Sequence, residues 1–197
     1  MSIVSHKHKF IFTHIPKTGG VSVVKILGLG GDNHKTLTEL KSFPQNKSFN
    51  EYFHFLFARN PFDRLVSSYK YFKKYGKDGS GDIKMGDIVN RYDTFQNFVK
   101  NLKNINDDEW VYRHFNQQVY WVVDKLDYIG RFENLQQDFN TICDKIGIPQ
   151  QQLPHKNKSK HKHYTEYYDD ETKQIVAEKY AKDIEYFGYE FGENTCK

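Results

Sequence analysis

The sequence predicts an α/β fold in which a parallel sheet is flanked by helices on both faces. Three runs, at 10–13, 52–58 and 128–131, are expected to form strands. The first is apolar without alternation, which is typical of a buried strand, and the second is strongly aromatic. A polar turn follows each run, and a segment with helical spacing follows each turn. Strands that alternate with helices in this way form units whose strands run parallel.

The helices follow from apolar spacing and from the residues that begin and end them. A first helix is expected over 21–27, because Gly28 follows its last apolar residue. A second is expected over 62–75, since Pro61 suits a first helical turn and apolar residues recur behind it at helical spacing. Further helices are expected at 36–41, 94–102, 134–146 and 170–187, the last of them capped by Asp170.

The whole chain, residues 1–197, is expected to form a single domain, because this length suffices for one well-buried core. Aromatic side chains, 16% of the residues, compensate for a modest hydrophobic content of 38%. Two segments stand apart from the predicted elements. The glycine-rich stretch 76–91 is interpreted as a mobile loop, and 155–163 as a basic loop.

Charge and cysteine content narrow the class of protein. A formal net charge of +4 suits an anionic ligand but is mild for a nucleic-acid-binding protein, so no nucleic-acid partner is expected. Cys143 and Cys196 are too widely spaced to indicate a disulfide framework or a metal site. Residues 1–9 lack the apolar core of a signal peptide, and no run approaches the ~20 apolar residues of a membrane span. We therefore expect no transmembrane segment and a cytoplasmic location.

The loop between the first strand and the first helix is the most informative segment. Residues 14–22 read HIPKTGGVS, so a lysine, two hydroxyls and two adjacent glycines stand at a helix start. Glycines let the backbone approach a ligand closely, and a helix N-terminus attracts anions. The residues expected to contact a phosphate or sulfate group are Lys17, Thr18, Gly19, Gly20 and Ser22.

This P-loop-like arrangement differs from the Walker A motif of ATP and GTP enzymes. That motif places its lysine after the second glycine, whereas Lys17 precedes Gly19 and Gly20. The loop therefore does not favour an ordinary triphosphate site. A plain strand-to-helix turn with a surface lysine remains an alternative interpretation.

A second polar turn follows the second predicted strand. Arg59 stands at the strand end, and Ser67 lies about two turns into the following helix, on a side that can face back toward it. An arginine binds phosphate through two parallel hydrogen bonds, so the pair could hold a second phosphate group. An arginine in a structural ion pair is the alternative.

Three segments, in this order along the chain, resemble motifs of a known family. Residues 16–22 are similar to the 5′-phosphosulfate loop of sulfotransferases, and residues 59–67 to their 3′-phosphate motif. The stretch 127–135, followed by Asp138 and Phe139, resembles a segment of chondroitin-type carbohydrate sulfotransferases. The chain as a whole resembles chondroitin-type and soluble bacterial sulfotransferases.

The resemblance implies a donor and a reaction. The donor is 3′-phosphoadenosine 5′-phosphosulfate (PAPS), and its sulfonate passes to a hydroxyl of a glycan or glycolipid. The loop residues Lys17 to Ser22 match the 5′ site, while Arg59 and Ser67 match the 3′-phosphate clamp. Lys17 then supplies positive charge to the leaving phosphate. No metal ion is expected.

A base must take the proton of the acceptor hydroxyl, and histidine suits that role near neutral pH. His34 is the first candidate, because catalytic histidines of related glycan sulfotransferases occupy this region. His114, in an Arg-His-Phe stretch that resembles the family, is the second. An exposed loop histidine is an equally good interpretation of His34. The basic loop 155–163 is interpreted as a flap over the 3′-phosphate, a glycan contact or a solvated loop.

Two other function classes stay open. One is a P-loop-like kinase of a small molecule, although the chain lacks the Gly-Lys-Ser/Thr order and an evident magnesium carboxylate after a strand. The other is a non-catalytic nucleotide-binding module, which would bind the nucleotide without transferring a group.

Overall fold

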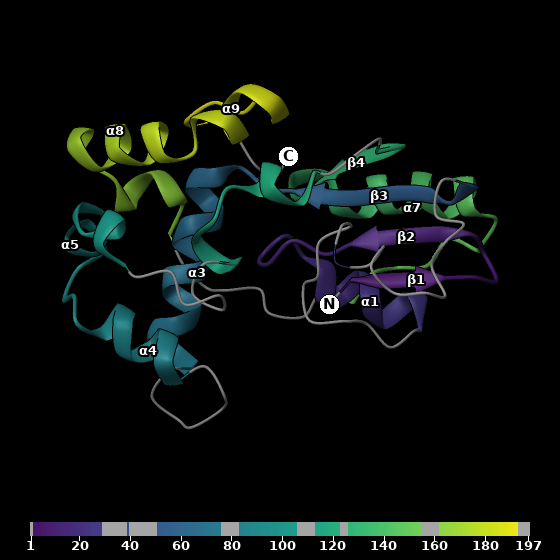
Figure 1. Cartoon of the computed structure of the whole chain (residues 1–197), viewed down its shortest axis with the longest axis horizontal. Helices are drawn as coiled ribbons and strands as arrows, with labels where there is room; N and C mark the ends of the chain where they lie inside the picture. The colour runs from purple at the N-terminus through teal and green to yellow at the C-terminus, as the bar shows by residue number, and fades with distance from the viewer. Residues whose placement is uncertain are drawn as a thin grey trace. The chain divides into compact units, whose positions relative to one another are not determined.

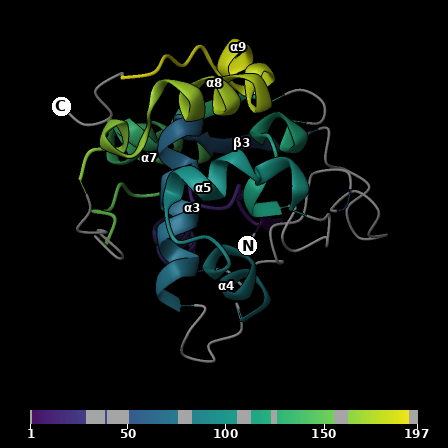
Figure 2. The ribbon, with the colours of Figure 1, turned by 90° about the vertical axis from the view of Figure 1, so that its left-hand side faces the viewer.

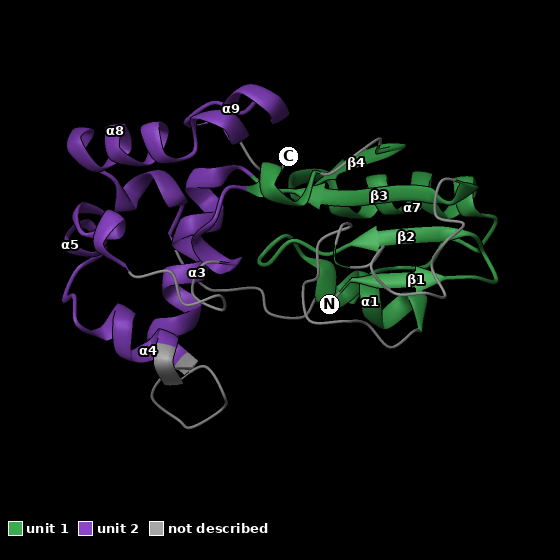
Figure 3. Ribbon diagram, in the orientation of Figure 1, with its two compact units in different colours: residues 1–59, 118–158, 194–197 green, residues 60–117, 159–193 purple. Residues whose placement is uncertain are grey.

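The computed structural model describes residues 2–28, 39, 51–75, 83–105, 113–122, 126–154 and 162–192. The chain divides into two compact units, each built from separate stretches of sequence (Figure 3). Unit 1 comprises residues 1–59, 118–158 and 194–197, and unit 2 comprises residues 60–117 and 159–193. The single domain that the sequence predicts over residues 1–197 stays a prediction. Each unit has a hydrophobic core of its own.

Unit 1 contains a four-stranded sheet in the order β1-β2-β3-β4 (Figure 1). The pairs β2–β3 and β3–β4 are parallel, and β1 pairs antiparallel with β2. The strands are β1 (Ile3–Ser5), β2 (Phe10–Thr13), β3 (Phe53–Ala58) and β4 (Tyr128–Arg131). The three predicted strands are confirmed, and β1 was missed because three residues are too short to show a pattern.

The helices of unit 1 follow the strands, as the α/β prediction requires. They are α1 (Gly20–Leu27), η4 (Gln118–Trp121), η5 (Phe132–Asn134) and α7 (Leu135–Ile146). Val23 of α1 and Phe139 of α7 pack with the strand residues Phe12 and Phe57 in one core cluster. Strand residues that point to the other face of the sheet, such as Leu56, are also fully buried. The predicted class, an α/β sheet flanked by helices, is confirmed, with one antiparallel strand added.

Parallel pairing decides where the candidate site lies. The carboxyl ends of β2, β3 and β4 point to the same edge of the sheet. Residues 14–19 follow β2 there, Arg59 follows β3, and Phe132 follows β4. Ligands of open α/β sheets bind at this edge.

Unit 2 is helical (Figure 2). Helix α3 carries buried side chains at 62, 65, 66, 69 and 72, which is the spacing that the sequence predicted. It packs against α4 and α8. The elements are α3 (Pro61–Tyr75), α4 (Ile83–Asn90), α5 (Phe95–Lys100), η3 (Leu102–Asn104), η6 (Tyr164–Tyr167), α8 (Asp170–Lys179) and α9 (Ala181–Phe187).

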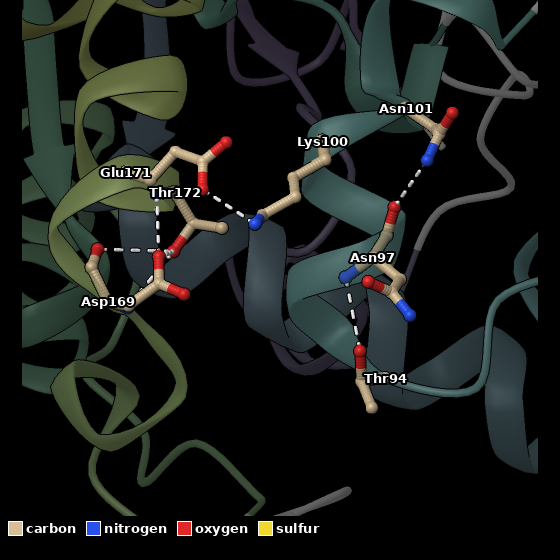
Figure 4. Close-up of polar contacts among 7 residues, drawn as sticks. All are labelled: Thr94, Asn97, Lys100, Asn101, Asp169, Glu171 and Thr172. Atoms are coloured by element: carbon tan, nitrogen blue, oxygen red, sulfur yellow. Dashed lines mark hydrogen bonds and ion pairs between the residues drawn. The ribbon is translucent and has the colours of Figure 1, made fainter.

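Side-chain caps fix the starts of two of these helices (Figure 4). Thr94 caps α5 by accepting a hydrogen bond from the main-chain N–H of Asn97 at 3.1 Å. Asp169 caps α8 by accepting one from the N–H of Thr172 at 2.8 Å. Lys100 and Glu171 join α5 to α8 through an ion pair at 2.6 Å. Both of its side chains are exposed, so this pair adds little stability.

Three expectations for unit 2 need correction. Residues 83–90 of the expected loop 76–91 form α4, because Met85 and Val89 on its apolar side are buried in the core. The last helix breaks at Tyr180, whose buried hydroxyl donates to the carbonyl of Phe115 at 2.8 Å. Its cap is Asp169 rather than Asp170. Apart from Glu39, the expected helix 36–41 lies outside the described residues, as do residues 76–82 and most of the basic loop.

Candidate cofactor-binding site

Two glycines shape the loop between β2 and α1. Gly19 caps the helix with φ +80°, and a Cβ there would lie 2.7 Å from Cδ2 of Leu135. A Cβ on Gly20 would overlap the ring of His14. Neither position has room for a side chain. The glycines that the sequence singled out are therefore needed by the loop itself, whatever it binds.

Lys17 adopts a left-handed backbone conformation, with φ +70°. Non-glycine residues rarely do so, and such conformations persist only where neighbours enforce them. One enforcing contact comes from Arg59, whose Nη1 donates to the carbonyl oxygen of Lys17 at 3.0 Å. The partly exposed Lys17 thus sits at the tip of a constrained turn at the sheet edge.

The two hydroxyls of the loop donate within the protein. Oγ1 of Thr18, which is fully buried, donates to the carbonyl of Ile15 at 2.9 Å. Oγ of Ser22 donates to the carbonyl of Pro154 at 2.9 Å. A hydroxyl carries one hydrogen, so each must release its present acceptor before it donates to an anion.

Arg59 is 6% exposed and is held on several sides. Its guanidinium carbon lies 3.9 Å from the centroid of the Phe132 ring, which is stacking distance. Its main-chain N–H and C=O both bond to the side chain of Gln118. The strand-end position predicted for Arg59 is confirmed, and the contact with the Lys17 loop brings the two predicted anion-binding residues together.

Gln118 is a residue that the sequence did not single out. It begins η4 and is fully buried. It stands in a stretch dominated by aromatic residues, where a lone glutamine carries no pattern that indicates its partner.

Ser67, the second residue predicted for the 3′-phosphate, belongs to unit 2. It lies on α3 and is partly buried. Its neighbour Ser68 is fully buried and faces the carbonyl of His114, with Oγ at 3.4 Å. The assignment of Ser67 rests on its motif.

Comparison with known proteins decides the family. The family model described as "Sulfotransferase family" matches residues 1–190. This chain belongs to the sulfotransferase family. No solved structure matches the chain significantly.

The curated relatives of this sulfotransferase-family chain are distant and mostly longer. It is 26% identical to carbohydrate sulfotransferase 14 of Danio rerio, over 75% of this chain and 48% of that protein. It is 24% identical to carbohydrate sulfotransferase 9 of Homo sapiens, over 92% and 47% of the two chains. An uncharacterized protein of Archaeoglobus fulgidus is 32% identical over 53% of this chain and 76% of that protein. The chain thus spans about half the length of the named carbohydrate sulfotransferases that it matches.

The third segment that resembles the sulfotransferase family forms β4 and the start of α7. Asp138 accepts the hydroxyl of Tyr128 at 2.9 Å and the N–H of Arg131 at 2.6 Å, which ties the helix to the strand. Burial, followed by the bond to Asp138, raises the pKa of the Tyr128 hydroxyl. A Cβ on Gly130 would overlap the ring of Phe57. This segment therefore carries packing residues that place Phe132 beside Arg59.

The two candidate bases of this sulfotransferase-family protein differ in what can be said of them. His34 lies outside the described residues. His114 is buried in unit 2, where its ring lies edge-on to Phe72 with 5.0 Å between centroids. The carbonyl of His114 accepts from Nη1 of Arg64 at 3.2 Å. Such enclosure is typical of a packing residue.

The described residues were considered for two further features, a metal-binding group and a membrane-spanning helix. Within them, no group of three or more His, Cys, Asp or Glu side chains is placed to hold a metal ion. None of the helices found there combines the length and apolar character needed to cross a bilayer.

Proposed function

We propose that this protein transfers a sulfonate group from PAPS to a hydroxyl of a carbohydrate, within a glycan or a glycolipid. The contact between the Arg59 guanidinium and the Lys17 carbonyl carries the proposal. It gathers a lysine, a glycine turn, a helix N-terminus and an arginine at the carboxyl edge of one sheet. A donor with phosphates at both its 5′ and 3′ positions matches such a set of groups. The names of the carbohydrate sulfotransferases among the relatives support the choice of acceptor.

The 5′ phosphosulfate is assigned to the turn before α1. The Lys17 ammonium and the amides at the helix start would hold its oxygens, with Gly19 and Gly20 allowing close approach. During transfer the acceptor oxygen bonds to sulfur while the bond from sulfur to the bridging phosphate oxygen breaks. Negative charge then grows on that phosphate, and Lys17 is the cation in place to stabilise it. Thr18 and Ser22 would contribute hydroxyls after exchanging their present acceptors.

The 3′-phosphate is assigned to Arg59, with Ser67 added from its motif. A guanidinium stacked on Phe132 has its plane fixed, and a planar fork of N–H groups matches two phosphate oxygens. A ring stacked on the guanidinium face does not block donation in the plane of the guanidinium. One of its nitrogens already bonds the Lys17 loop, so phosphate binding here would also stiffen the 5′ site.

The acceptor proton is assigned to His34. A neutral imidazole can accept the proton of a hydroxyl as its oxygen attacks sulfur. The assignment rests on the resemblance of this region to glycan sulfotransferases and on the enclosure of His114.

Isothermal titration calorimetry with adenosine 3′,5′-bisphosphate and with ATP, each with and without Mg²⁺, tests the donor class. We expect the bisphosphate to bind more tightly than ATP and without a requirement for Mg²⁺. ATP binding that equals or exceeds it would overturn the proposal, and strong dependence on Mg²⁺ would indicate a kinase.

Transfer of labelled sulfate from PAPS to a panel of glycan and glycolipid acceptors tests the reaction itself. We expect label on at least one acceptor class. Tight binding of the bisphosphate together with no labelled product on any acceptor would contradict the enzyme and indicate a nucleotide-binding module.

A further inference from the structure

The backbone of Arg59 lies just past the end of the sheet. The last register pair of β3 with β4 is Ala58 with Arg131, and the last of β3 with β2 is Leu56 with Thr13. Arg59 is nonetheless buried, and buried main-chain N–H and C=O groups need hydrogen-bond partners.

Gln118 supplies both partners. Its Oε1 accepts from the N–H of Arg59 at 2.9 Å, and its Nε2 donates to the C=O of the same residue at 2.8 Å. The orientation of this amide is fixed, because a main-chain N–H can only donate and a carbonyl can only accept. The side-chain amide of Gln118 thus takes the place of a peptide group on a neighbouring strand, at the point where the pairing of β3 with β2 and β4 has ended.

The contacts of Arg59 continue from this backbone to the phosphate loop. Its guanidinium rests on Phe132 and donates to the carbonyl of Lys17, the residue held at φ +70°. A tilt of the Arg59 main chain displaces the guanidinium, because the side chain between them is long. Small changes of this kind are enough to spoil a site that depends on tightly held geometry.

We infer that Gln118 is a positioning residue for the phosphate loop: it fixes the Arg59 backbone so that the guanidinium reaches the Lys17 carbonyl and stabilises the left-handed turn of Lys17. The ligand used to test this rests on the proposed function, whereas the contacts themselves do not. Gln118 acts through Arg59, and its effect on binding depends on that arginine being present.

Two variants disrupt the pair of hydrogen bonds between the Gln118 side chain and the Arg59 main chain in different ways. Gln118→Met keeps the length of the side chain and removes both bonds. Gln118→Glu keeps the acceptor for the Arg59 N–H but sets a carboxylate oxygen against the Arg59 carbonyl. We expect each to weaken binding of adenosine 3′,5′-bisphosphate by about tenfold.

Gln96→Met is the matched control. Nε2 of Gln96 donates to the carbonyl of Tyr167 at 3.1 Å, so the control also removes a bond from a glutamine to a main-chain carbonyl. Gln96 lies on α5 and is not one of the residues assigned to the site. We expect it to leave bisphosphate affinity unchanged, even where it lowers the unfolding temperature as much as Gln118→Met does.

A double-mutant cycle separates positioning from a general loss of stability. In an Arg59→Met background, Gln118→Met should cause no further loss of bisphosphate affinity, because the group that it positions is gone. An equal loss in both backgrounds would overturn the inference, as would unchanged affinity of both Gln118 variants.

Protonation offers a rescue that keeps the test valid if Gln118→Met folds poorly. A protonated carboxyl can accept from the Arg59 N–H and donate to its C=O, as the native amide does. Burial beside a carbonyl raises the pKa of such a carboxyl. The affinity of Gln118→Glu, divided by that of the wild type at the same pH, should therefore rise as the pH falls from 8 to about 5.5. A ratio that stays constant would contradict the inference. Wild-type protein that prefers ATP would instead contradict the proposed function, whatever the variants do.

Discussion

Arg59 and Lys17 are joined by a hydrogen bond of 3.0 Å from a guanidinium nitrogen to a main-chain carbonyl, between the ends of two parallel strands. The bond uses the main-chain carbonyl of Lys17 and not its side chain. It also makes the loop after β2 depend on the residue after β3. Residues that the sequence assigned to two separate phosphates therefore form one connected structure.

Replacing Lys17 with Ala should abolish sulfate transfer while leaving the fold intact. The side chain is partly exposed, whereas the contact that holds the turn uses the main-chain carbonyl. Loss of the cation at the leaving phosphate should lower the transfer rate by about 100-fold or more. Labelled-sulfate transfer and thermal unfolding measure the two effects. Lys25→Ala, at an exposed lysine of α1, the helix that follows the loop, is the control and should retain activity. A Lys17→Ala protein that fails to fold would show the lysine to be structural.

Arg59→Lys keeps the charge but removes the planar fork. We expect bisphosphate affinity to fall by about tenfold, because an ammonium cannot stack on Phe132 and reach both the Lys17 carbonyl and a phosphate. Calorimetric titration measures the change. Arg91→Lys, at an exposed arginine of unit 2, should bind as the wild type does. Affinity in Arg59→Lys equal to that of the wild type would mean that charge alone is needed.

Much of the sheet could be predicted from sequence because β2 and β3 are almost wholly buried. Their runs are almost entirely apolar or aromatic, and each is followed within three residues by a proline. The helix α3 was equally plain, since its buried positions repeat with helical spacing. Helix α4 was hidden by the glycines that precede it and by Gly86, which lies between its two buried apolar residues. Its stability comes from packing on α3, which no local pattern reveals.

The candidate site was predictable where the residues present indicate a single kind of ligand. A lysine and two glycines before a helix indicate anion binding, and the structure places them at the sheet edge. The hydrogen bonds between the Gln118 side chain and the Arg59 main chain were not predictable. The two residues are 59 positions apart, and the groups of Arg59 that take part are main-chain atoms. The hydrogen bonds from the hydroxyls of Thr18 and Ser22 to main-chain carbonyls were also missed, because a hydroxyl near a loop has many possible acceptors.

Gly20→Ala should destabilise unit 1 through one clash. The new methyl would overlap the ring of His14, which is buried and stacks on Phe12. Overpacking of this kind costs about 1–3 kcal/mol. Denaturant unfolding measures the loss, and the double variant Gly20→Ala with His14→Ala should recover part of it. Failure of the second change to recover any stability would place the cause elsewhere.

The Asp169 cap should make the stability of unit 2 depend on pH in the acid range. Hydrogen bonds from the side chain and the N–H of Thr172 hold the pKa of this carboxyl below its usual value. A group with a lowered pKa in the folded state stabilises the protein above its unfolded pKa and loses that contribution as the pH falls through the folded one. The stability difference between wild type and Asp169→Ala should therefore shrink in acid. Asp170→Ala, which removes no cap, should show a smaller difference at neutral pH.

His34→Asn should separate catalysis from binding. Without a base for the acceptor hydroxyl, transfer of labelled sulfate should fall by about 100-fold or more, while bisphosphate affinity stays near that of the wild type. His6→Asn, at an exposed histidine of the turn before β2, is the matched control and should remain active. His114→Asn should instead lower the unfolding temperature, because its ring packs on Phe72. Full activity in His34→Asn, combined with a stable but inactive His114→Asn protein, would move the base to His114.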